Sequence, residues 1–86
     1  MAAYRVEITR SAEKRLRKLS RPDRERVAGA MLRLGDDPFP RGTRKISGYD
    51  DVFRVRVGPY RILYSVSGAT LVILILKIGR RKDVYR

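Results

Sequence analysis

The sequence predicts a single α+β domain, residues 1–86, in which two helices pack on one face of a largely antiparallel sheet. Three observations favour this fold class: an alternating segment near the start, two amphipathic helical segments after it, and three successive strand-like segments. A chain of 86 residues has room for one hydrophobic core. The predicted order is an N-terminal strand, an antiparallel helical hairpin and a three-stranded antiparallel meander.

The N-terminal half contains the predicted first strand and the hairpin. Residues 4–8 alternate between apolar and polar, which is typical of a half-buried strand. Ser11 is the expected N-cap of the first helix, Pro22 is expected to open the second, and Gly35 is its expected C-cap. The apolar faces of the two helices consist of Ala12, Leu16 and Leu19, and of Val27, Ala30, Met31 and Leu34.

The C-terminal half contains the predicted meander. Residues 39–48 are expected to form a loop with a short extended piece at Lys45–Ile46. Turns are predicted at Gly58–Pro59 and at Ser67–Gly68, between strand-like segments. The strand-like segment between these turns has an apolar set that is expected in the core, namely Ile62, Tyr64 and Val66. The apolar run Leu71–Leu76 does not alternate, which predicts a central strand covered on both faces.

Composition limits the possible chemistry. The chain has 21 Lys and Arg against 9 Asp and Glu, and a net charge of +12 favours a nucleic acid or an acidic protein as partner. The alternative is that the surplus arginine serves solubility or reflects codon usage. Without histidine or cysteine, thiol chemistry and the usual transition-metal ligands are excluded, and we expect neither a metal nor another cofactor. The start does not resemble a signal peptide and the longest apolar run is far below the ~20 residues that span a bilayer, so we expect a cytoplasmic protein without a membrane partner.

One face of the predicted meander is rich in arginine. Alternation places Arg54, Arg56 and Arg61 on the sheet face away from the core, where substitution of Arg54 or Arg56 should leave the core untouched. Gly79 is expected to bend the chain and bring a further basic cluster near this face, namely Arg80, Arg81 and Lys82. Guanidinium groups bind phosphate oxygens bidentately and stabilise a phosphorane-like transition state. The alternative is a solvated face on which arginine stems cover apolar neighbours.

No efficient general base is evident among these residues. Tyr85 has a phenol whose ordinary pKa is about 10, so it could act as a base only if nearby cations lowered that value. A tyrosine near a terminus can equally serve as a hydrophobic anchor. Arginine stays protonated and cannot accept a proton. The predicted site is therefore rich in positive charge and poor in acid–base groups.

Three segments together form a combined motif: Phe53-Arg54-Val55-Arg56, the segment GPYRILY at 58–64, and the segment KIGRRKDVYR at 77–86. With the order of elements, this motif resembles the RelE/ParE-like toxins of type II toxin–antitoxin systems. The resemblance implies a metal-independent endoribonuclease that enters the ribosomal A site and cleaves mRNA with the 2′-hydroxyl as nucleophile. It also implies a cognate acidic antitoxin, encoded adjacently, as partner.

The resemblance assigns roles to residues of this chain. The implied catalytic residues are Arg61, Arg81 and Tyr85, and the implied RNA-binding residues are Arg54, Arg56, Arg80 and Lys82. Many relatives have histidine where this chain has Arg80, and some have lysine at the positions of Arg54 and Arg56. Both differences leave Tyr85 as the remaining candidate base.

Two other functions stay open, because one fold can carry several activities. ParE-like members inhibit DNA gyrase and do not cut RNA. A catalytically silent member would bind antitoxin or nucleic acid through the same basic face. The presence of both Arg61 and Tyr85 favours the ribonuclease hypothesis.

Overall fold

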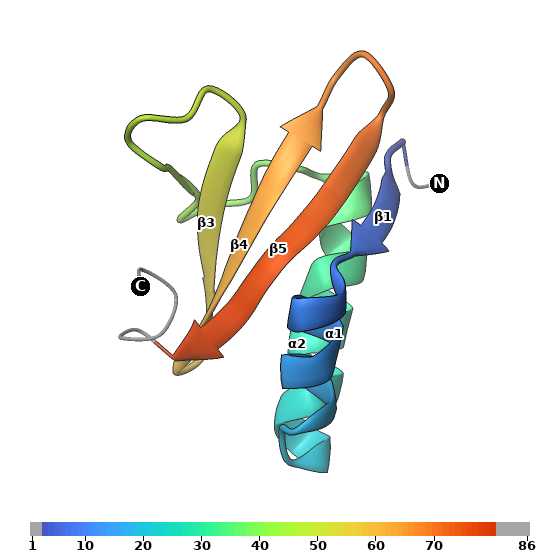
Figure 1. Cartoon of the computed structure of the whole chain (residues 1–86), viewed down its shortest axis with the longest axis vertical. Helices are drawn as coiled ribbons and strands as arrows, with labels where there is room; N and C mark the ends of the chain where they lie inside the picture. The colour runs from blue at the N-terminus through green and yellow to red at the C-terminus, as the bar shows by residue number, and fades with distance from the viewer. Residues whose placement is uncertain (1–2, 81–86) are drawn as a thin grey trace.

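The computed structural model describes residues 3–80, and its elements follow the predicted order (Figure 1). The strands are β1 (Arg5–Ile8), β2 (Arg44–Lys45), β3 (Val52–Val57), β4 (Tyr60–Ser67) and β5 (Val72–Arg80). The helices are α1 (Arg10–Arg17) and α2 (Arg21–Asp36). The α+β fold class predicted from the sequence is confirmed.

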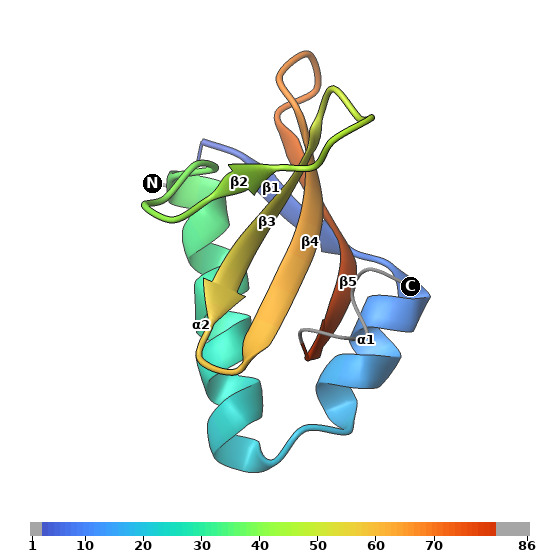
Figure 2. The ribbon, with the colours of Figure 1, turned by 90° about the vertical axis from the view of Figure 1, so that its left-hand side faces the viewer.

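The strands form one sheet in the order β1-β5-β4-β3-β2. Strands β3, β4 and β5 make the predicted antiparallel meander, and β2 extends it antiparallel to β3. Strand β1 pairs parallel with β5, a pairing between the two ends of the chain that the alternation near the N-terminus does not predict. In Figure 2 the sheet lies in front of both helices, so one sheet face packs on the helices and the other faces away from them.

Helix α1 begins two residues earlier than the sequence predicts. Thr9, rather than Ser11, is the N-cap, and its side-chain oxygen accepts a hydrogen bond from the Ala12 amide at 3.2 Å. The same hydroxyl donates to the Leu76 carbonyl at 3.0 Å. Because Thr9 satisfies both a helix amide and a carbonyl of β5, tertiary contact selects it over Ser11.

Helix α2 begins as predicted and ends later than predicted. Pro22 lies in its first turn, but the expected C-cap, Gly35, lies inside the helix and is buried. The Gly35 carbonyl accepts hydrogen bonds from the amides of Ala3 and Tyr4, at 3.1 and 3.0 Å. The helix ends one residue later, with Asp37 as C-cap. Gly35 is therefore a buried helical residue whose carbonyl anchors the N-terminal segment, and not a left-handed cap.

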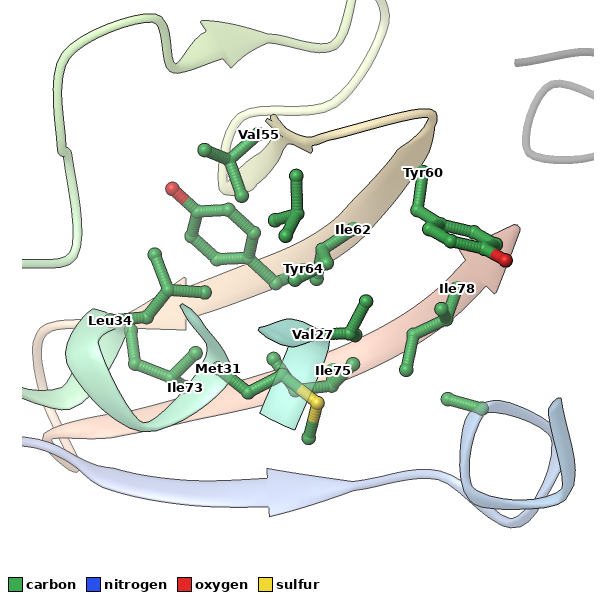
Figure 3. Packing of buried hydrophobic residues seen from close by; sticks show 12 residues of the cluster. Val27, Met31, Leu34, Val55, Tyr60, Ile62, Tyr64, Ile73, Ile75 and Ile78 are labelled. Atoms are coloured by element: carbon green, nitrogen blue, oxygen red, sulfur yellow. The ribbon is translucent and has the colours of Figure 1, made fainter. Parts of the chain in front are cut away.

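The hydrophobic core lies between the helices and one sheet face (Figure 3). Val27 and Leu34 of α2 are almost fully buried against Ile62, Tyr64 and Ile75 of the sheet. Ile62 and Tyr64 were both expected in the core and are fully buried, whereas the third expected member of β4, Val66, is only partly buried.

Strand β5 is interior, but it is not covered equally on both faces as the apolar run predicts. Ile73 and Ile75 are fully buried on the helix face, while Leu74 and Leu76 on either side are half-buried. Both helices pack on the same face, so the other face lacks a covering layer of helices. An irregularity opposite Leu63 and Tyr64 shifts the register of the β4–β5 ladder by one residue.

Candidate functional site: an arginine-rich sheet face

The register of the sheet places arginines directly opposite one another on the face away from the helices. Arg44 of β2 pairs with Arg54 of β3, and Arg56 of β3 pairs with Arg61 of β4. We name Arg44, Arg54, Arg56 and Arg61 the arginine face. Like charges directly opposite one another destabilise a sheet, so this face concentrates positive charge that an anion would stabilise.

The face assigned to Arg54, Arg56 and Arg61 from alternation is confirmed, but the exposure expected for Arg54 is wrong. Only 5% of Arg54 and 8% of Arg61 is exposed, whereas Arg56 is open to solvent. Within residues 3–80, Nε of Arg54 is buried without a hydrogen-bond partner. A buried guanidinium is costly to leave unpaired, so a substitution at Arg54 also alters packing and is not a surface change.

Two hollows, each of about 200 Å³, open along the arginine face and meet at Arg56. The first is lined by Arg41, Gly42, Arg44, Arg54 and Arg56. The second is lined by Arg56, Gly58, Pro59, Tyr60 and Arg61, at the turn between β3 and β4. No carboxylate belongs to the described residues that line either hollow, so both are suited to an anion.

Arg80 lies on the other sheet face, contrary to the expectation that Gly79 turns it toward the arginine face. Gly79 pairs with Arg61 inside β5, and the next pair joins Arg80 to Tyr60. The Arg80 guanidinium lies over the Tyr60 ring, 5.8 Å from its centroid. The Tyr60 hydroxyl donates to Asp23 Oδ2 of α2 at 2.8 Å. The strand continues through Gly79 without a bend, so Arg80 helps to attach the meander to α2.

The remaining predicted site residues, Arg81, Lys82 and Tyr85, lie outside the described residues. Their proposed roles therefore rest on the sequence. In residues 3–80 there is no group of three or more His, Cys, Asp and Glu side chains that could hold a metal ion. No helix in the described part of the chain is long and apolar enough to cross a membrane.

Sequence reasoning missed two arginines that border the site. Arg41 and Arg44 belong to the segment expected to be loop, and β2 begins one residue before the predicted extended piece. Neither position shows an alternation or a motif that would have identified it. Their place beside β3 follows from the strand pairing of β2, which depends on the tertiary fold.

The one phenol in the described chain with a clearly shifted pKa does not belong to the arginine face. Burial raises the pKa of the Tyr64 phenol. The hydrogen bond with the Thr43 side chain lowers this pKa, and the negative charge of Asp37 raises it. Its hydroxyl donates to the Pro38 carbonyl at 2.6 Å. Tyr64 is thus a structural phenol of the helix face and is unsuited to act as a base.

Comparison with known proteins gives consistent matches over nearly the whole chain. Residues 6–85 match the family described as the ParE toxin of the type II toxin–antitoxin system parDE. The RelE1 protein of Methanocaldococcus jannaschii is 30% identical over 86 residues, with 96% of each chain covered. Toxin RelG of Mycobacterium tuberculosis is 33% identical over 89 residues, covering 96% of this chain and 97% of RelG.

Among solved structures, the fold is similar to the archaeal RelE–RelB complex from Pyrococcus horikoshii OT3. The TM-score is 0.83 at 33% sequence identity, and the match covers 95% of this chain and 99% of the matched chain. Sequence and structure therefore agree on the same group of relatives.

Proposed function

The chain belongs to the RelE/ParE family of type II toxins, and we propose that it is a RelE-like endoribonuclease that cleaves mRNA on the ribosome. The observation that carries this proposal is the Arg56–Arg61 pair beside a hollow of about 200 Å³. Arg56 is exposed and can contact a substrate, whereas Arg61 is buried and therefore held in place. A fixed guanidinium is preorganised for the charge that develops on a phosphate in the transition state.

In the proposed reaction, the 2′-oxygen of the nucleotide before the scissile bond attacks phosphorus. A new P–O2′ bond forms, the P–O5′ bond breaks, and the products carry a 2′,3′-cyclic phosphate and a 5′-hydroxyl. Arg61 and Arg81 bind the non-bridging oxygens as negative charge increases on them. Tyr85 takes the proton of the 2′-hydroxyl or positions this group while water takes the proton, and water supplies the proton that the leaving 5′-oxygen gains.

The proposal needs no metal ion, because the arginines supply the positive charge that a metal would otherwise provide. Proton transfer is the weaker half of the chemistry. Arginine cannot accept a proton, and the chain has no histidine to do so. Positioning on the ribosome would then contribute much of the rate, which fits an enzyme that acts only on ribosome-bound mRNA.

An antitoxin is the proposed regulatory partner. The matched Pyrococcus structure is a complex of RelE with RelB, and a net charge of +12 suits an acidic binding segment here. Such a segment typically folds on binding, with apolar residues against the toxin and acidic residues near its arginines. We propose that its gene is adjacent.

The ribonuclease proposal is tested by assaying cleavage of ribosome-bound mRNA in the presence of a chelator. We expect Arg61→Ala, Arg81→Ala and Tyr85→Phe each to lose most activity, because removal of one preorganised donor typically lowers the rate ~10²–10³-fold. Arg61 is buried, so Arg61→Lys provides a second variant that keeps charge and most of the volume but lacks the bidentate fork. Melting temperature and antitoxin binding are measured for every variant to separate lost chemistry from lost folding.

The same assay can contradict the proposal at two levels. Full activity of Tyr85→Phe would exclude the phenol from the chemistry while leaving the arginines in place. Intact mRNA in the parent assay, together with inhibition in a gyrase supercoiling assay, would replace the ribonuclease with a gyrase inhibitor. That second candidate is favoured by the family match, whose description names the ParE toxin.

A further inference from the structure

We propose that Arg41, Arg44, Arg54 and Arg56 form a second phosphate site, which binds the RNA backbone phosphate next to the scissile one. This inference rests on the proposed ribonuclease function for the identity of its ligand. The site is the first of the two hollows, at the edge of the sheet where β2 and the preceding turn lie beside β3. We name it the flanking site.

A tight turn fixes one wall of the flanking site. The Thr43 amide donates to the Pro40 carbonyl at 3.0 Å, and the Thr43 hydroxyl donates to the same oxygen at 2.6 Å. Gly42 has φ +89, the left-handed conformation that a type II turn requires at its third residue. Arg41, the residue before Gly42, is therefore presented by an ordered turn rather than by an irregular loop.

Strand pairing fixes the opposite wall. Arg44 lies directly across the ladder from Arg54, and the described residues that line this hollow include no carboxylate. Arg54 is 5% exposed, and its Nε has no hydrogen-bond partner in residues 3–80. A buried N–H group without an acceptor destabilises the folded state, and a bound anion that accepts its hydrogen bond would remove this destabilisation.

The two hollows share Arg56 as a lining residue, so one extended RNA strand could place successive phosphates in them. They meet at Arg56, and Arg54 lies two residues before it on β3, a rise of about 6.6 Å along the strand. An RNA strand whose scissile phosphate lies at Arg61 would therefore place its neighbouring phosphate in the flanking site. Arginines line both hollows along the same face, which suits the repeating phosphate charges of a nucleic acid backbone better than a single carboxylate.

The test measures binding of the full-length protein to a short RNA made non-cleavable by a 2′-O-methyl group at the cleavage position. One RNA has normal phosphates, and in the other a single phosphate beside the scissile one is replaced by a neutral methylphosphonate. We expect the neutral replacement to weaken binding to the parent several-fold. It should have a smaller effect on Arg41→Ala and Arg44→Ala, because each variant has lost one of the exposed guanidinium groups that bind that phosphate.

Each of the two variants should also lower the slope of log affinity against log salt, by a part of the roughly 0.7 that one phosphate contact on a single strand contributes. Arg24→Ala is the matched control, since it removes the same charge from an exposed position on α2, away from both hollows. Arg54 is not used as the primary test, because its burial makes a folding defect difficult to separate from a binding defect.

Three outcomes would be decisive. If Arg41→Ala and Arg44→Ala behave like Arg24→Ala, the flanking site does not bind RNA and the inference is wrong. If the variants keep RNA affinity but lose affinity for an acidic antitoxin peptide, the hollow takes a carboxylate and the inference is again wrong. If the RNA result is as expected while the parent leaves ribosome-bound mRNA intact, the phosphate site stands and the ribonuclease proposal fails.

Discussion

The hydroxyl of Tyr64 stabilises the fold, although a phenol of this kind can also act in catalysis. Its ring is fully buried between the sheet and α2, 6.0 Å from the ring of Phe53, and its hydroxyl donates to the Pro38 carbonyl. The phenol thus ties β4 to the segment that leaves α2. The pattern of β4 predicted the buried ring, but the hydrogen bond depends on a loop 26 residues away.

Tyr64→Phe should remove a pH-dependent part of the stability. Burial raises the pKa of the Tyr64 phenol above its ordinary value of 10.0, so the folded state holds this proton more tightly than the unfolded state. The stabilisation is fully present below pH 10 and is lost as the pH rises through the folded pKa. We expect the variant to be less stable by about 1 kcal/mol at neutral pH and to show a shallower loss above pH 10, measured by urea unfolding.

The two proteins have every other titratable group in common, so the comparison isolates Tyr64. Parallel losses of stability in the two proteins above pH 10 would mean that this phenol does not contribute to alkaline unfolding.

Arg54 marks the limit of prediction at the residue scale. Alternation correctly gives the sheet face of Arg54, because side chains of a strand point to alternate faces whatever surrounds them. Alternation does not give burial, which depends on which distant segments return to that face. Residues 41–44 return to this edge of the sheet, where Arg44 pairs with Arg54, and no local pattern predicts this.

At the scale of elements, the turn between β3 and β4 sets the register on which the arginine face depends. Val57 pairs with Tyr60 across the two-residue loop Gly58–Pro59, as the sequence predicts. Gly58 has φ +58, which the first loop residue of a type II′ hairpin requires. A Cβ at this position would lie 2.8 Å from Nη1 of Arg26, the end of a flexible and exposed side chain.

Gly58→Ala should destabilise the protein by about 1–2 kcal/mol, because a residue with a Cβ is disfavoured at positive φ. Gly48→Ala should cost about as much, since Gly48 has φ +88 but open space around its Cβ position. Gly68→Ala, with open space and no positive φ, should be close to neutral. Thermal unfolding of the three variants measures these differences.

The comparison separates backbone strain from crowding. A much larger loss for Gly58→Ala than for Gly48→Ala would show that Arg26 cannot move aside. A neutral Gly58→Ala would show that this turn can change type without cost.

Prediction succeeded for elements that local patterns define and failed where distant contacts decide. The strands of the meander, both helices and the two turns follow from periodicity and from Gly and Pro. The cap at Thr9 was missed because its second partner, the Leu76 carbonyl, is 67 residues away. The parallel β1–β5 pairing and the Arg44–Arg54 pairing were missed for the same reason.

At the scale of the whole molecule, the dominant feature is a net charge of +12 on 86 residues. The salt bridges at Arg5–Glu7, Arg17–Glu13 and Arg21–Glu25 are all solvent-exposed, and such pairs contribute only about 0–1 kcal/mol each. Repulsion among the excess cations should therefore exceed the attraction within these pairs. We expect this repulsion to lower the stability of the folded protein at low salt.

Raising the KCl concentration from 0.01 to 0.1 M should consequently raise the melting temperature, because the screening length falls from about 30 to about 10 Å. Each ~1 kcal/mol of relieved repulsion corresponds to about 4–8 °C for a domain of this size. The double variant Lys14→Gln with Lys18→Gln lowers the charge from +12 to +10 at two exposed positions, one in α1 and one at its C-cap, with little change in helix propensity. Calorimetry should show that it melts higher than the parent at 0.01 M KCl and gains less from added salt. A melting temperature that falls as KCl is added would mean that the surface ion pairs outweigh the repulsion. In that case the large positive charge does not destabilise the fold, and an anionic partner would not stabilise the protein by relieving it.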